Sequence, residues 1–234
     1  MPKAPKNQTP RRPLLIFDLD GTLIDSAPDI AVALNRVLAS AGRDMVSFQA
    51  ARAMVGQGAR TLVQRGFEAT GGPPADLVGE TARFLTIYGR ALACHTTVYD
   101  GVAQTLGMLR DSGHTLALLT NKPLAPTRAI LGALDLERYF DADLVLGGDG
   151  PYPKKPDPAS LHAILQFRAH APAQAVMIGD SINDIAAAQS AGIAAIAVRY
   201  GYCDRPPEDL GADSLIARFS DLPDALEGLP PPRR

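Results

Sequence analysis

Short apolar runs occur once near the start of the chain and then repeatedly through its second half. The intervals between the later runs have the length and the amphipathic periodicity of helices. Continuous apolar runs of this length are typical of strands buried on both faces of a parallel sheet. The expected strands are residues 14–17, 116–119, 144–146, 175–178 and 194–198, and the expected helices are 101–112, 124–135, 158–170 and 183–191. The alternation predicts an α/β fold with a doubly wound, Rossmann-like parallel sheet.

Residues 26–96 interrupt this alternation with helical periodicity alone, broken at glycine-containing segments. About seventy residues are too many for a connection in a compact domain, where loops beyond ~15 residues are uncommon. We therefore expect an inserted helical cap at 26–96 and an α/β core made of 14–25 and 97–228. Residues 1–13 are expected to be a disordered basic tail, and residues 229–234 a frayed C-terminus.

Composition restricts the classes of partner. The 234 residues are 46% hydrophobic and 21% charged, with a net charge of -2, so no overall basic field attracts nucleic acid. No segment approaches the ~18 consecutive apolar residues that a membrane span needs, and the first residues lack a secretory signal pattern. We expect no membrane partner and a cytoplasmic location. Cys94 and Cys203 are interpreted as inert buried thiols.

Polar residues follow the apolar runs at the places where strands should end. Asp18 and Asp20 follow the first run, Thr120 and Asn121 the second, and Asp180 and Asp184 lie at and just after the end of the fourth. In an open parallel sheet these strand ends meet at one crevice. Carboxylates gathered there repel one another unless a cation is present, and oxygen-only ligands favour Mg²⁺ over zinc. The pattern indicates a magnesium site.

Such a site suits phosphoryl transfer to a carboxylate. A cation neutralises phosphate charge and lets the anionic Asp18 attack phosphorus. Asp20, two residues further, could protonate the leaving alkoxide and later deprotonate the hydrolytic water. Thr120 and Asn121 would donate hydrogen bonds to the transferring group.

The chain resembles the haloacid dehalogenase-like phosphatases, and among them the phosphoglycolate phosphatase type. The resemblance rests on four motifs that occur in the family's order: Asp18-x-Asp20-Gly21-Thr22-Leu23-x-Asp25-Ser26, Thr120-Asn121-Lys122, Lys155-Pro156-Asp157-Pro158 and Gly179-Asp180-Ser181-x-x-Asp184. The cap segment Val55-Gly56-Gln57-Gly58 also resembles the loop of the phosphoglycolate type.

The resemblance implies roles for these residues. Asp18 becomes the nucleophile and Asp20 the acid/base. Mg²⁺ would be held by the Asp18 carboxylate, the Asp20 backbone carbonyl and Asp180, with Asp184 close by. Thr120 and Lys155 would hold phosphoryl oxygens; Lys154 is a second candidate for the motif-three lysine, although alignment on Lys-Pro-Asp-Pro favours Lys155.

Substrate choice is assigned to the cap. A small phosphate ester is expected, with 2-phosphoglycolate the best single guess. Gln57, Gly58 and Arg60 are candidate contacts, Arg60 because a guanidinium can bind a carboxylate on the leaving group through two hydrogen bonds. Arg60 could equally be a solvated helix charge, and the glycines around Gln57 a plain connector.

Of the other interpretations of these residues, one is excluded by the sequence and the rest stay open. A calcium loop at Asp18 fails because the EF-hand pattern requires Gly and Glu where this chain has Leu23 and Asp29. Asp180 and Asp184 could instead cap a helix. A sugar phosphomutase or a non-catalytic phosphate-binding module could use the same fold, and the chain could be a monomer or a homodimer.

Overall fold

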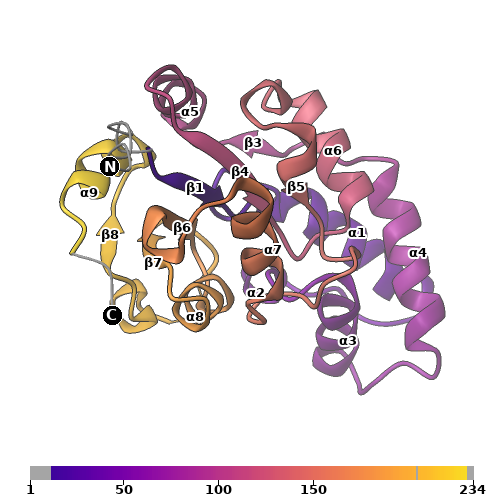
Figure 1. Ribbon diagram of the computed structural model, residues 1–234. Helices are drawn as coiled ribbons and strands as arrows, with labels where there is room; N and C mark the ends of the chain where they lie inside the picture. Colours follow the sequence, from indigo (N-terminus) through magenta and orange to yellow (C-terminus); the bar gives the residue numbers. More distant parts are fainter. Residues whose placement is uncertain (1–11, 204, 231–234) are drawn as a thin grey trace, which may run out of the picture.

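A parallel sheet forms the centre of the computed structural model, which describes residues 12–203 and 205–230 (Figure 1). Within those residues six strands lie in the order β5-β4-β1-β6-β7-β8, and all neighbouring pairs are parallel. The strands are β1 (Leu14–Phe17), β4 (Thr115–Leu119), β5 (Val145–Leu146), β6 (Ala175–Gly179), β7 (Ala194–Val198) and β8 (Ser214–Ile216). The predicted α/β Rossmann-like sheet is confirmed. The expected basic tail falls outside the described residues up to residue 11.

Helices cover both faces of the sheet, as the alternation of side chains along β1 requires. Leu15 and Phe17 belong to one hydrophobic core, and Leu14 and Ile16 to the other. The first core also contains residues of α5 (Val102–Asp111), α6 (Leu124–Ala133) and α9 (Leu222–Glu227), and the second contains residues of α7 (Ala159–Arg168) and α8 (Ile182–Ser190). In the described part of the chain, no helix has both the length and the apolar character needed to cross a membrane.

A group of helices lies between β1 and the rest of the sheet in the sequence. The chain leaves through β2 (Ile24–Asp25) and returns through β3 (Thr97–Val98), which pair as an antiparallel ribbon. Between them come α1 (Ala27–Ser40), α2 (Phe48–Ala53), α3 (Ala59–Ala69) and α4 (Leu77–Gly89). Helix α1 packs against the other three, and α3 also packs against α4, to one side of the sheet (Figure 1). We propose that this group is a cap on the α/β core.

A buried carboxylate joins the two ends of this helical group. Asp29, in the first turn of α1, is 5% exposed. It accepts hydrogen bonds from the backbone N–H groups of His95 and Thr96 and from the Thr96 hydroxyl, at 2.7–3.0 Å. Hydrogen bonds to a charged group contribute about 1.5–3 kcal/mol each. Asp29 therefore fixes the segment that returns to β3 against the helix that leaves β2.

Several details differ from the sequence-based expectations. The third expected strand begins at Val145, because Leu144 still belongs to a 3-10 turn. Strand β8 and the β2–β3 ribbon were not predicted, because two or three residues show no measurable periodicity. Cys94 is exposed and Cys203 half-buried, so the interpretation of both as buried thiols is wrong. Leu229, expected to fray, is partly buried against the first core; residues 231–234 lie outside the described part.

Candidate active site

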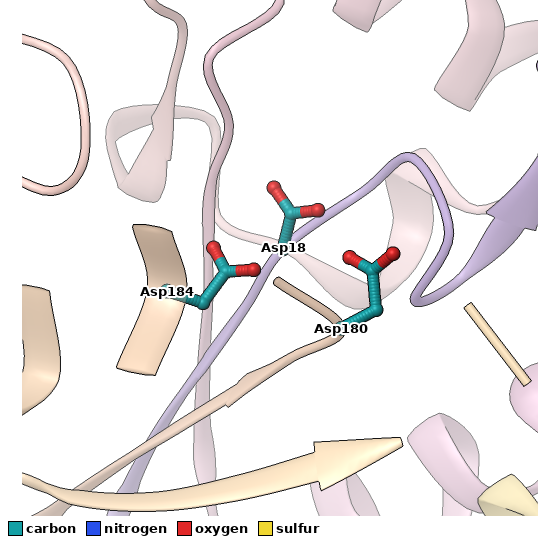
Figure 2. A group of neighbouring side chains, drawn as sticks. All are labelled: Asp18, Asp180 and Asp184. Atoms are coloured by element: carbon teal, nitrogen blue, oxygen red, sulfur yellow. The ribbon is translucent and has the colours of Figure 1, made fainter. Parts of the chain in front are cut away.

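Three buried carboxylates meet at the carboxyl ends of the central strands. Asp18 follows β1, Asp180 follows β6, and Asp184 lies in the first turn of α8. They project to the same side of the sheet edge, as Figure 2 shows, and one oxygen from each lies within 4.8 Å of the others. Strands β4 and β5 lie on one side of β1, and the next strand in sequence, β6, lies on the other side. Ligands in open α/β sheets bind at the point where the strand order reverses in this way.

The position of Asp180 depends on close backbone approach. The Tyr202 N–H donates to Asp180 Oδ2 at 2.6 Å, and the Thr22 hydroxyl lies 3.4 Å from Oδ1. A Cβ at either Gly21 or Gly201 would overlap the Asp180 side chain, and Gly21 also has a φ of 89°. These two glycines leave the space in which the carboxylate sits.

Asp184 uses its two oxygens differently. The Ser181 backbone N–H and hydroxyl donate to Oδ2 at 3.0 and 2.6 Å, which caps the start of α8. The other oxygen, Oδ1, lies 2.6 Å from Lys155 Nζ. Helix capping, which the sequence left open for this residue, therefore coexists with a place in the acid cluster.

A buried lysine lies between two acids of this cluster, Asp18 and Asp184. Lys155 Nζ lies 2.6 Å from Asp18 Oδ1, from Asp184 Oδ1 and from the Leu119 carbonyl oxygen. The ammonium donates hydrogen bonds to Asp18 and to the Leu119 carbonyl and forms an ion pair with Asp184, whose Oδ1 has no hydrogen-bond partner among the described residues. The neighbouring Lys154 is exposed, so the structure places Lys155 at Asp18.

Burial sets the electrostatics of the acids. It raises the pKa of Asp18 to about 7, against the opposing attraction of Lys155 and with the help of the charge on Asp184. Burial also raises the pKa of Asp180, with the Asp18 charge adding to the effect. A divalent cation among these oxygens would offset their repulsion. The donors are all oxygens, come from three carboxylates and lie within 4.8 Å, which fits Mg²⁺.

Asp20 is held by two residues of the motifs. Lys122 Nζ lies 2.8 Å from both Asp20 oxygens, and the Ser26 hydroxyl donates to Oδ1. Burial opposes the charge on Lys122, but the Asp20 carboxylate outweighs it and the pKa of Lys122 rises overall. Sequence reasoning assigned no contact to Lys122 or Ser26, although both stand inside the quoted motifs. Their side chains fix the orientation of the expected acid/base.

Thr120 and Asn121 both line the same cavity but differ in what holds them. The Thr120 hydroxyl oxygen accepts from the Lys122 N–H at 3.1 Å. The Asn121 side chain exchanges hydrogen bonds with the Lys155 backbone and donates to the Gly56 carbonyl at 3.1 Å. Asn121 therefore shapes the Lys155 loop and links it to the helical insertion.

The cavity over the acids is small and has an apolar roof. Its volume is about 70 Å³, compared with roughly 300–1,000 Å³ for sites of drug-sized ligands. The helical insertion contributes mainly apolar residues and glycines, among them Val55, Gly56, Gly58, Leu62, Phe84 and Tyr88. Gly58 lines the cavity, whereas Gln57 and Arg60 are exposed and do not line it.

Comparison with known proteins identifies the family to which the chain belongs. The family model of the haloacid dehalogenase-like hydrolases matches residues 13–192. The chain is 40% identical over 216 residues to a phosphoglycolate phosphatase of Caulobacter vibrioides, covering 90% of this chain and 89% of that one. It is 38% identical to a phosphoglycolate phosphatase of Agrobacterium fabrum, with 93% of each chain covered. A solved structure from Haemophilus somnus, described as a predicted phosphoglycolate phosphatase, superposes with a TM-score of 0.87 at 31% identity, over 92% of this chain and 98% of that one.

Proposed function

Because the chain belongs to the haloacid dehalogenase-like hydrolases and is a phosphatase, we propose that it hydrolyses 2-phosphoglycolate with Mg²⁺ through a phosphoryl intermediate on Asp18. The observation that carries the proposal is the place of Asp18 at the end of the central strand, within the cluster of buried carboxylates and 2.6 Å from Lys155. No other described residues of this chain form such a cluster of three acids. The choice of 2-phosphoglycolate as the substrate comes from the names of the relatives described above.

The reaction divides into two displacements at phosphorus. An Asp18 oxygen forms a bond to phosphorus as the bond to the ester oxygen breaks, and Asp20 gives its proton to the leaving alkoxide. Water then attacks the same phosphorus, Asp20 takes a proton from it, and Asp18 leaves as a carboxylate with inorganic phosphate as product. Lys155 and Thr120 would hold phosphoryl oxygens during both displacements.

The metal would be held by the Asp18 carboxylate, the Asp20 backbone carbonyl and Asp180, with Asp184 close by. When bound there, Mg²⁺ supplies positive charge that lets an anionic nucleophile approach an anionic ester. The remaining contributions come from the chain: Tyr202 orients Asp180, and Lys122 and Ser26 orient Asp20.

The substrate proposal is tested by comparing kcat/KM over a panel of phosphorylated metabolites. We expect 2-phosphoglycolate to rank first, because the small cavity disfavours large leaving groups and the relatives are named for this ester. The panel should include a sugar phosphate whose products are identified. An isomerised sugar phosphate in place of inorganic phosphate would favour the mutase. Turnover of none of the esters would favour a binding module.

Removal of the metal gives a further prediction. EDTA is expected to abolish activity, and Mg²⁺ but not Ca²⁺ should restore it, because the longer and looser coordination of Ca²⁺ misplaces the nucleophile. Mg²⁺ at a hundredfold excess over Kd should also stabilise the metal-free protein by about 2.7 kcal/mol, measured as a rise in Tm. Asp180→Ala should remove most of that rise. Full activity in excess chelator would contradict the proposal.

A small phosphate ester is the only partner that we propose. We propose that the chain serves this function as a monomer or a homodimer.

A further inference from the structure

Tyr88 places a buried hydroxyl in the roof of the cavity. It lies near the end of α4, is 3% exposed and lines the cavity. Its ring stacks on Phe84 with the centroids 5.6 Å apart and an interplanar angle of 12°. The hydroxyl oxygen is buried and has no hydrogen-bond partner among the described residues.

A buried hydroxyl without a hydrogen-bond partner lowers the stability of the folded protein unless a ligand pairs with it. Such a hydroxyl loses its hydrogen bonds to water and gains none in the folded protein. A phenylalanine at the same position would fill the same space without this cost. The other residues that the helical insertion contributes to the cavity are apolar or glycine. Among the described residues, the Tyr88 hydroxyl is thus the one polar side-chain group that this roof offers to a ligand.

The surroundings of Tyr88 indicate which part of a ligand it meets. Lys122 Nζ lies 4.9 Å from the centre of the Tyr88 ring and also holds Asp20. An acid that protonates the leaving oxygen must lie beside that oxygen. Tyr88 is therefore on the side of the leaving group, whereas Lys155 and Thr120 are on the side of the phosphoryl group. Burial raises the pKa of the Tyr88 hydroxyl, against the opposing effect of the nearby Lys122 ammonium, so the hydroxyl stays protonated as a donor.

We propose that the Tyr88 hydroxyl donates a hydrogen bond to a carboxylate on the leaving group, with the Lys122 ammonium supplying the nearby positive charge. Tyr88 is then a specificity-determining residue, and the site selects small anionic leaving groups. This deepens the proposed function and rests on it. It also moves carboxylate recognition from the exposed Arg60 to the roof of the cavity.

The test compares Tyr88→Phe with the wild type on two esters, 2-phosphoglycolate and ethyl phosphate, which lacks the carboxylate. Losing a hydrogen bond to a charged group should lower kcat/KM for 2-phosphoglycolate by about ten- to a hundredfold, mainly through KM. The loss on ethyl phosphate should be at most a few-fold. Because the removed hydroxyl is unpartnered, the Tm of the ligand-free variant should be equal to that of the wild type or higher. Tyr152→Phe, at an exposed tyrosine that does not line this cavity, is the matched control and should alter neither preference nor Tm.

The outcomes separate this inference from the function on which it rests. A wild type that prefers 2-phosphoglycolate and a Tyr88→Phe variant that keeps the preference would overturn the inference alone. Equal losses on both esters together with a lower Tm would also overturn it, since Tyr88 would then serve only the packing of α4. A wild type that hydrolyses the two esters equally well would overturn both the substrate proposal and the inference.

Discussion

Replacing Asp18 with Asn is expected to lower kcat by at least about 10⁴-fold while the protein stays folded, because an amide cannot form the bond to phosphorus. The fold should survive because Asn has the same shape, and its amide oxygen can still accept from Lys155 Nζ. Burial disfavours the charged carboxylate here, so the neutral amide should not reduce the Tm of the metal-free protein. Release of inorganic phosphate and thermal unfolding are the two measurements.

A control substitution of an exposed aspartate shows whether the effect is specific to Asp18 or follows from replacing an aspartate anywhere in the chain. Asp100 is exposed, and Asp100→Asn should leave both turnover and Tm unchanged. Turnover in Asp18→Asn within tenfold of the wild type would show that Asp18 does not carry the phosphoryl group. A large drop in its Tm would mean that the carboxylate serves the fold, and the loss of activity would then need a different explanation.

The Asp20→Asn variant is expected to lose about 10²- to 10⁴-fold in rate, the usual contribution of a positioned acid/base. The loss in kcat/KM should depend on the leaving group, because kcat/KM reports the steps up to phosphoryl transfer to Asp18. 4-Nitrophenol leaves readily without a proton, so the loss on 4-nitrophenyl phosphate should be much smaller than on ethyl phosphate.

This dependence also separates proton transfer from a disturbed active site. Without its negative charge, the residue at position 20 attracts Lys122 less strongly, and a general distortion would affect both esters alike. Losses in kcat/KM that are the same for the two leaving groups would therefore contradict the assignment of Asp20 as the acid. A loss below tenfold on ethyl phosphate would contradict it as well.

The regular parts of the fold could be predicted because burial imposes a pattern on the sequence. Strands β1, β4, β6 and β7 are buried on both faces and appear as apolar runs, within one residue of their bounds in the structure. Strand β8 and the β2–β3 ribbon are two or three residues long, and their positions depend on pairing with distant strands that no local pattern reveals.

The acids of the site could be located because parallel strands end at a common edge. Asp18, Asp180 and Asp184 meet there, as the pattern of polar residues after the strands indicates. The roof of the cavity could not be predicted in the same way. Which face of α4 covers the site depends on how α1, α3 and α4 pack, and helical spacing alone does not distinguish Tyr88 from a core residue.

Arg60 and Lys122 show that residue type alone does not predict which cation lies at the site. Lys122 belongs to one of the four motifs and Arg60 follows the cap segment that ends at Gly58, and a guanidinium is the better partner for a carboxylate in principle. The structure leaves Arg60 exposed on α3 and buries Lys122 against Asp20. The choice depends on the distance of each side chain from the cavity, which is a property of the tertiary packing.

The central claim, that Asp18 carries the phosphoryl group between the two displacements, is tested most directly by a single-turnover rapid-quench experiment. Enzyme in excess is mixed with ³²P-labelled 2-phosphoglycolate and Mg²⁺, quenched in acid, digested and mapped. If Asp18 carries the phosphoryl group, label appears on the peptide containing Asp18 before inorganic phosphate is released, and then decays as phosphate forms. Release of phosphate with no labelled enzyme preceding it, or label on a different residue, would contradict the account.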